Sequence, residues 1–265
     1  MSMDLWREQH SGALFAIVDG AADRSAVARF YELSHGEASP LFAGTTFGEQ
    51  AVLGPWLLSN PSTEFMDATP ELSGFYLVSD QPIDVVRRHW QSLIQVIRDG
   101  EIVYFRFSDS RIFLPMFNAM SPEERDAIMG PCTGIWISGT GFTRTPRLPF
   151  RAALDTPWFH IQSHHLAALY DEDRHAYILR RRLWQSMTAM MERHPDPASA
   201  ILPVLRQANA EKLEGDVLDG VVAGALTLQA GLSLESIRVP LMLTDAEWAQ
   251  VSHWMAKHKE LIGAH

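Results

Sequence analysis

The sequence is short of cysteine and of positive charge. Its 265 residues include a single cysteine, Cys132. One thiol cannot close an internal disulfide or supply a multi-cysteine zinc site, and such usage fits a reducing compartment. The 22 Lys and Arg residues stand against 32 Asp and Glu residues, which gives a formal net charge of −10. Because an acidic chain repels phosphate backbones, the composition disfavours nucleic acid as a partner.

The sequence also lacks long hydrophobic runs. Its longest nearly apolar stretch, residues 221–232, contains Gln229 and is shorter than the ~18 residues that a membrane-spanning helix needs. Residues 1–8 mix acidic and basic side chains and have no apolar signal-peptide core. With 46% hydrophobic and 20% charged residues, the composition is that of a globular protein. We therefore expect a soluble, cytoplasmic protein that does not bind a membrane.

Motifs for the common catalytic sites are missing. The sequence has no Gly-x-Ser-x-Gly nucleophile elbow, no phosphate-binding loop ending in Gly-Lys-Ser/Thr, and no His-Glu-x-x-His motif. Gly139 and Gly141 follow a β-rich run, but Arg144 replaces the third glycine of a dinucleotide-binding fingerprint and Pro146 opposes a helix there. We interpret these glycines as part of a linker. We expect Cys132 to be a buried small residue, and we expect no catalytic residue and no cofactor.

Three histidines form the best candidate for a metal site. They are His160, His164 and His165, with Asp171 or Asp173 nearby. His160 and His164 would share one face if this segment were helical, which is the geometry that two imidazoles need to bind one ion. Surface or helix-capping histidines are the other interpretation. A metal-dependent hydrolase that uses the three histidines is thus the alternative to a non-catalytic protein.

The first half of the chain alternates β-rich runs with helical patterns. Strands are expected at residues 14–18, 56–58, 74–78 and 133–138. Asp99-Gly100 between two β-rich runs predicts a hairpin over residues 94–107. Asp80 and Pro82 predict the start of one helix, and a capping box of Ser121 and Glu124 predicts the start of another.

Only helical patterns stand out after about residue 150. Helices are expected at residues 171–193, 198–212 and 216–230, followed by a C-terminal helix that Thr244 and Glu247 open with a capping box. Strands alternating with helices, followed by helices alone, predict two lobes. We expect an α/β (α+β) N-terminal lobe with a mixed sheet over residues 1–145, and an all-α C-terminal lobe over residues 146–265.

The predicted helix over residues 171–193 carries two features that are typical of binding surfaces. The arginine run 180–182 could bind an acidic partner, or it could be a solvated face in which one arginine pairs with Glu172 or Asp173. A methionine cluster on the same helix fits either core packing or an adaptable binding surface; its members are Met187, Met190 and Met191.

Six segments of the N-terminal lobe are similar to a known family when they are taken in order. They are residues 14–20, 54–57, 74–79, 85–90, 99–111 and 130–136. Together they resemble the adaptor and chaperone family of the bacterial type VI secretion system, the Tap or TEC proteins. The resemblance covers residues 13–138, and its most specific part is the Phe-Arg-Phe-x-Asp-x-Arg stretch at 105–111. Ser108 stands where an aromatic residue is usual, and Ser110 where a proline is usual.

Asp109 and Arg111 of that stretch could form a charged site or a turn-stabilising ion pair. The resemblance itself implies a non-catalytic role in the cytoplasm. Such adaptors bind and stabilise one toxic effector protein and help load it onto the spike protein VgrG or its PAAR tip.

A protein of this kind needs an exposed apolar patch with a polar rim. Trp184 shares the predicted helix with the arginine run, so the candidates for binding the partner are Arg180, Arg181, Trp184 and Met187. A structural or regulatory module for some other partner is a third possibility.

Overall fold

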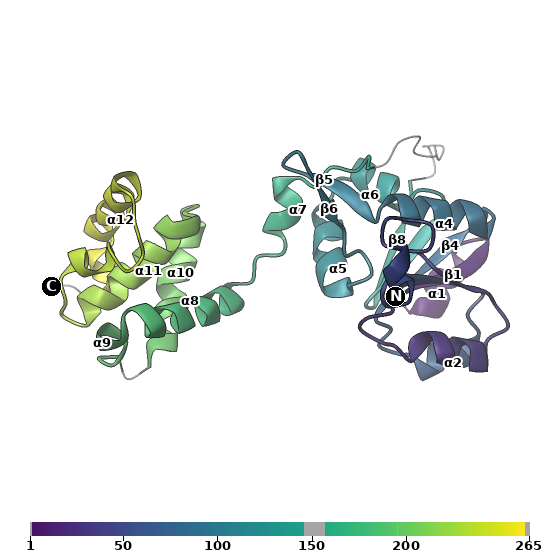
Figure 1. Ribbon diagram of the computed structural model, residues 1–265, viewed down its shortest axis with the longest axis horizontal. Helices are drawn as coiled ribbons and strands as arrows, with labels where there is room; N and C mark the ends of the chain where they lie inside the picture. The colour runs from purple at the N-terminus through teal and green to yellow at the C-terminus, as the bar shows by residue number, and fades with distance from the viewer. Residues whose placement is uncertain (1, 146–156, 195, 263–265) are drawn as a thin grey trace. The chain divides into compact units, whose positions relative to one another are not determined.

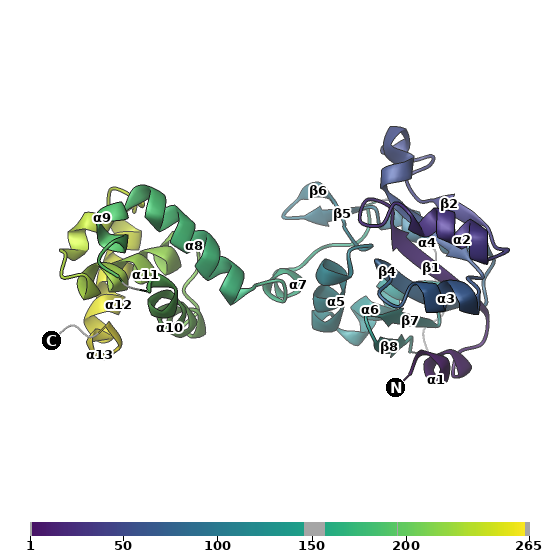
Figure 2. The ribbon, with the colours of Figure 1, turned by 90° about the horizontal axis from the view of Figure 1, so that it is seen from below.

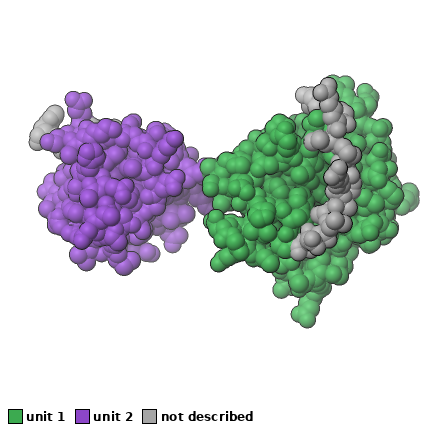
Figure 3. Space-filling model, turned by 90° about the horizontal axis from the view of Figure 1, so that it is seen from above, with its two compact units in different colours: residues 1–169 green, residues 170–265 purple. Residues whose placement is uncertain are grey.

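The computed structural model describes residues 2–145, 157–194 and 196–262. The chain divides into two compact units, residues 1–169 and residues 170–265 (Figure 3). The first unit combines a sheet with helices and the second is helical, which confirms the predicted fold class. Within the described residues, no helix has both the length and the apolar character needed to cross a membrane.

A six-stranded sheet with the order β2-β3-β1-β4-β7-β8 forms the centre of the first unit. All of its strand pairs are antiparallel, whereas a mixed sheet was expected from the sequence. The two central strands, β1 and β4, are apolar up to their last residues, Asp19 and Ser79, because they are covered on both faces. The strands are β1 (Ala13–Asp19), β2 (Ala38–Pro40), β3 (Pro55–Ser59), β4 (Gly74–Ser79), β7 (Gly134–Ile137) and β8 (Thr140–Thr143).

Side-chain alternation along the strands divides the apolar residues of the first unit between two cores. One core packs helices α4 (Ile83–Ser92), α5 (Ser110–Ala119) and α6 (Pro122–Met129) on one face of the sheet. The other packs helices α1 (Met3–Glu8), α2 (Ala26–Leu33) and α3 (Thr63–Ala68) on the opposite face (Figure 2). The large buried side chains are Trp90 and Phe113 in the first core, and Trp6, Phe30 and Phe65 in the second.

The predicted hairpin is present as β5 (Gln95–Arg98) and β6 (Glu101–Tyr104). Asp99 and Gly100 have φ values of 50° and 83°, the left-handed conformation that a two-residue hairpin turn requires. The second strand ends at Tyr104, earlier than expected, because the next residues turn into the core and bury Phe105 and Phe107. The middle of β5 also pairs with a later segment: Ile97 N–H donates to the carbonyl oxygen of Phe159 at 2.9 Å.

Several local expectations for the first unit need correction. Gly139 lies in the turn between β7 and β8, at φ 81°, so the interpretation of this segment as a linker was wrong. Helix α4 has Pro82 at its N-cap, and Asp80 lies outside the helix. Helix α5 was missed because Pro115 interrupts its pattern. A short 3-10 helix at Gly48–Leu53 and helix α7 at Ser163–Ala167 complete this unit.

The second unit is a helical bundle around helix α11 (Gly215–Gln229), which lies between α10 (Pro197–Ala210) and α12 (Asp245–Lys257) (Figure 1). Burial on several sides explains why α11 is apolar almost all round. The capping box of Thr244 and Glu247 is present. The long helix expected at 171–193 is divided at Met187, where φ −141° and ψ 45° leave the helical region. It forms α8 (Glu172–Ser186) and α9 (Thr188–Met191), while Leu234–Ile237 and Lys259–Ile262 are short helical turns.

The division between the two units follows Leu169. Residues 157–169 belong to the first unit, because Trp158 and Phe159 pack against its core. The predicted boundary at residues 145 and 146 borders a stretch, residues 146–156, that lies outside the described residues.

Candidate functional site

Helix α8 carries three of the four residues that were predicted from the sequence to bind a partner, and the fourth, Met187, is at its C-cap. Asp171 caps its start by accepting a hydrogen bond from Arg174 N–H at 2.9 Å, and acidic residues in the first turn complement the helix dipole. Ala176, Leu179 and Leu183 recur at helical spacing and are buried in the bundle core. This spacing fixes which face of α8 points away from the core.

The outward face of α8 carries aromatic and basic side chains. Tyr177 is 52% exposed and Trp184 is 41% exposed, and they are seven residues apart, so they lie on the same side of the helix. Arg180 and Arg181 lie between them and approach the Tyr177 ring, with guanidinium carbons 5.7 and 5.9 Å from its centroid. We call the four residues Tyr177, Arg180, Arg181 and Trp184 the aromatic–basic face.

The four predicted partner-binding residues differ in their exposure to solvent. Arg181 and Trp184 are exposed and Arg180 is half-buried, whereas Met187 is only 9% exposed and packs in the bundle core. Met190 and Met191 are buried with it, so the methionine cluster fits the core interpretation. Tyr177 was not among the predicted residues, although its spacing of seven residues from Trp184 was a signal for it in the sequence.

Arg182 is the arginine of the run that pairs inside the unit. Its Nη1 atom lies 2.9 Å from Asp219 Oδ2 and 3.8 Å from Asp216 Oδ1. The prediction that an arginine of the run pairs with Glu172 or Asp173 was wrong, because Arg182 faces α11 and not the start of its own helix. Glu172 instead pairs with Arg206 on α10.

The histidine cluster contains two of the three predicted histidines. His164 Nε2 and His165 Nε2 each lie 3.2 Å from an oxygen of Glu124, and the three potential ligand atoms are within 4.8 Å of one another. His160 is exposed and precedes α7, which begins at Ser163, so the expected helical pairing of His160 with His164 was wrong. Asp171 serves as the cap of α8.

Hydrogen bonding explains what this cluster does. His165 is fully buried, and its Nδ1 accepts a hydrogen bond from Gln162 N–H at 3.0 Å, which places the ring proton of a neutral imidazole on Nε2, toward Glu124. A metal-binding nitrogen must be unprotonated, so this arrangement opposes coordination through Nε2. Burial alone would raise the pKa of Glu124, but the hydrogen bonds from Ser121 N–H and His164, together with the adjacent His165, lower it to about 2. The cluster is therefore a carboxylate–imidazole clasp that joins α6 to α7.

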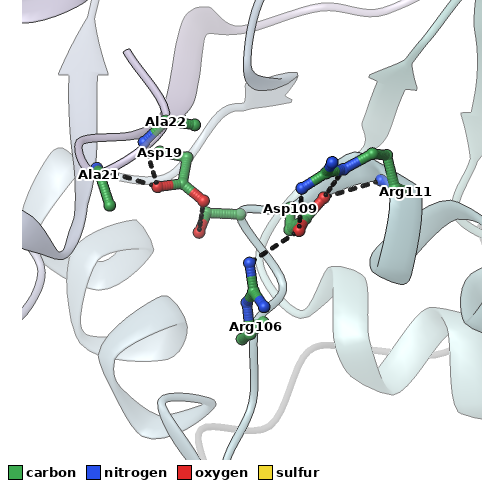
Figure 4. Close-up of polar contacts among 7 residues, drawn as sticks. Asp19, Ala21, Ala22, Arg106, Asp109 and Arg111 are labelled. Carbon is green, nitrogen blue, oxygen red and sulfur yellow. Dashed lines mark hydrogen bonds and ion pairs between the residues drawn. The ribbon is translucent and has the colours of Figure 1, made fainter. Parts of the chain in front are cut away.

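Asp109 is the centre of an ion-pair group at the start of α5 (Figure 4). Its side chain is 7% exposed and accepts hydrogen bonds from Arg106 Nη2 at 2.9 Å and from Arg111 Nε and Nη2, each at 3.0 Å. It also caps the helix by accepting from Arg111 N–H at 3.1 Å. The hydrogen bonds from Arg111 hold the pKa of Asp109 below its ordinary value. The ion-pair interpretation of Asp109 and Arg111 is confirmed, with Arg106 as a further member.

Cys132 is fully buried, as expected. Burial raises the pKa of its thiol to about 12. Because the thiolate is the reactive form, Cys132 is a packing residue and not a nucleophile.

Residues 14–127 match the model of a family described as a domain of unknown function, DUF4123. The matched segment runs from β1 into α6 and includes Arg106, Asp109 and Arg111. No curated protein and no solved structure matches the chain. Helix α8 and its aromatic–basic face lie outside the matched segment.

Proposed function

We propose that this protein is a non-catalytic adaptor that binds and stabilises a toxic effector of a type VI secretion system and helps load it onto a VgrG or PAAR spike protein. The aromatic–basic face of α8 is the observation that carries the binding role. The resemblance of residues 13–138 to the adaptor family supplies the biological setting, and the match of residues 14–127 to a domain of unknown function is consistent with it.

The aromatic–basic face has the composition of a binding hot spot. Tyr, Trp and Arg are the residue types that most often dominate the energy of protein interfaces. An aromatic side chain buries about 150–250 Å², so covering the exposed half of Tyr177 or Trp184 would contribute about 2–3 kcal/mol each at ~25 cal/mol per Å². The rigid helix holds both rings in place, so binding would cost little backbone entropy.

The reactive side chains described above have structural roles, which supports a non-catalytic protein. Asp109 caps a helix and holds two arginines, Glu124 and His165 form a clasp, and Cys132 is a buried thiol. The metal-dependent hydrolase is the weaker proposal, because His160 lies apart from the cluster and the His165 tautomer opposes metal coordination.

Co-expression with the product of the neighbouring gene, which the proposal expects to be the toxin, followed by sizing of the complex, tests the proposal. We expect a 1:1 complex with the unaltered protein. The double variant Arg181→Glu/Trp184→Ala should bind about tenfold more weakly or worse, because it removes one ring and reverses one charge. A matched control, Arg24→Glu/Tyr31→Ala, changes an exposed arginine and an exposed aromatic residue of the other unit and should bind as the unaltered protein does.

Two outcomes separate the parts of the proposal. A folded double variant that retains full affinity would remove the α8 face from the account. A protein that fails to hold the neighbouring toxin in solution, or whose deletion leaves secretion of that toxin unchanged while the apparatus still fires, would contradict the adaptor function itself.

A further inference from the structure

A cavity of about 800 Å³ lies in the first unit, on the side where β1 ends and β4 begins. Its volume is within the range of about 300–1,000 Å³ that is usual for ligand sites. Tyr76 and Trp136 supply aromatic lining, and Ser73, Ser108 and Ser138 supply hydroxyl groups. Helix α8 contributes no residue to this cavity, which is lined by residues of the first unit alone.

One side of the cavity is positively charged. Arg106 and Arg111 both line it, and both direct hydrogen bonds at the single carboxylate of Asp109 (Figure 4). Two positive charges on one negative charge leave a net charge of +1 in this group. A guanidinium has five N–H bonds, so each arginine keeps donors beyond the one or two that it directs at Asp109. Because the buried Asp109 holds both arginines in place, a carboxylate that binds them meets an ordered group of donors.

Another part of the lining is negatively charged. Asp19, at the end of β1, holds its carboxylate in place by accepting hydrogen bonds from Ala21 and Ala22 N–H at 3.0 and 3.1 Å and from Ser108 Oγ at 3.3 Å. These donors are neutral, so none of them cancels the negative charge of Asp19, although Arg111 of the same lining is near enough for Asp19 to contribute to raising its pKa. Glu71 adds an exposed carboxylate to the same lining. A multiply charged anion such as phosphate would be repelled by both acids.

We propose that this cavity binds a dipolar peptide segment of a protein partner, in which an acidic side chain contacts Arg106 and Arg111 and a neighbouring basic side chain contacts Asp19 and Glu71. The choice of a peptide as the occupant rests on the proposed adaptor function. The charge pattern itself selects a ligand that carries both signs, because the lining offers both positive and negative groups, which come from different elements. The aromatic and hydroxyl groups between them suit the backbone and stems of such a segment.

Nuclear magnetic resonance of the full chain tests this site directly. Trp136 lines the cavity, and a Trp136→Phe variant assigns its indole N–H signal. The probes are three acetylated, amidated tetrapeptides that differ only in two side chains: Glu with Lys, Gln with Lys, and Glu with Gln. We expect the Glu–Lys peptide to shift the indole signal saturably, with a dissociation constant about threefold or more below those of the other two.

Variants on the two sides should remove different parts of this preference. Arg111→Gln should abolish the preference for Glu over Gln, and Glu71→Gln should reduce the preference for Lys over Gln. Both positions are exposed, so the fold is expected to survive. Equal shifts from all three peptides, no shift from any of them, equally tight binding of inorganic phosphate, or equally tight binding of free glycine would each overturn the proposal. None of these readouts requires the toxin, so failure here is distinguishable from failure of the adaptor function.

Discussion

The charged residues of the candidate sites in the two units differ in their surroundings. In the first unit, Asp109 and Glu124 are tied into hydrogen-bonded groups that fix a helix start and join two helices. In the second unit, α8 leaves Arg180, Arg181 and two aromatic rings facing outward. The group around Asp109, in the unit that contains the family-matched segment, is thus ordered by hydrogen bonds, while the outward face of α8 in the helical unit is the surface that we propose for binding a partner.

The largest expected effect falls on the first unit and not on the second. Gly130 has φ 57°, and a Cβ there would lie 2.2 Å from the ring of the buried His89. Gly130→Ala should therefore destabilise the first unit by about 3 kcal/mol or more. Amide hydrogen exchange read separately for the two units measures this difference.

Gly100→Ala is the matched control for that substitution. Gly100 also has a positive φ, 83°, but open space surrounds the position of its Cβ. Gly100→Ala should therefore destabilise the first unit by only about 1 kcal/mol, through backbone strain alone. Equal losses for the two variants would contradict the packing assigned to His89.

Acid should also weaken the first unit selectively. Burial lowers the pKa of His89 to about 4, below the ordinary value of 6.5. The unfolded chain then binds a proton more readily than the folded one, so stability is full above pH 6.5 and falls as the pH drops toward 4. At pH 5 the loss from His89 is about 2 kcal/mol.

Hydrogen exchange at pH 7 and at pH 5, corrected for the intrinsic exchange rate, measures the acid effect. The buried His165, whose pKa burial also lowers, adds to it in the same direction. A His89→Gln variant should lose less between the two pH values than the unaltered protein. An equal loss in both proteins would exclude His89 as the source.

Asp109→Asn should have a moderate effect. The variant keeps an oxygen for Arg111 N–H and Arg111 Nε but turns an amide donor toward the Nη2 atoms of Arg106 and Arg111, so the two charge-assisted hydrogen bonds from those atoms are lost. A loss of about 1–2 kcal/mol is expected for the first unit, measured by urea unfolding. Loss of less than a few tenths of a kcal/mol would show that the ion-pair group does not stabilise the start of α5.

The smallest effect is expected for the exposed pair of Glu172 and Arg206, 3.0 Å apart on the second unit. Arg206→Gln should change the free energy of unfolding by about 0.5 kcal/mol or less, because water and salt screen such pairs. A loss above about 1 kcal/mol would mean that this ion pair stabilises the helical unit more than exposed ion pairs usually do.

Local sequence signals predicted the parts of the fold that local chemistry decides. The Asp99-Gly100 turn and the capping boxes at Ser121 and Thr244 are where residue types alone favour one backbone conformation. Helix α5 could not be predicted in the same way, because Pro115 breaks its pattern and the contacts of Phe113 and Phe117 with the core compensate.

The candidate sites, too, could be predicted only as far as local sequence signals decide them. Arg181 and Trp184 could be selected from composition and helical spacing, but the burial of Met187 depends on the break in the helix at that residue. The cavity could not be found from the sequence, because Asp19, Glu71 and Arg111 come from distant segments that only the fold brings together.

Calorimetric titration of the purified protein with the product of the neighbouring gene, the expected toxin, tests the central claim most directly. The account predicts stoichiometric binding by the unaltered protein and at least roughly tenfold weaker binding by the folded Arg181→Glu/Trp184→Ala variant. Identical heats and affinities for the two proteins would contradict it.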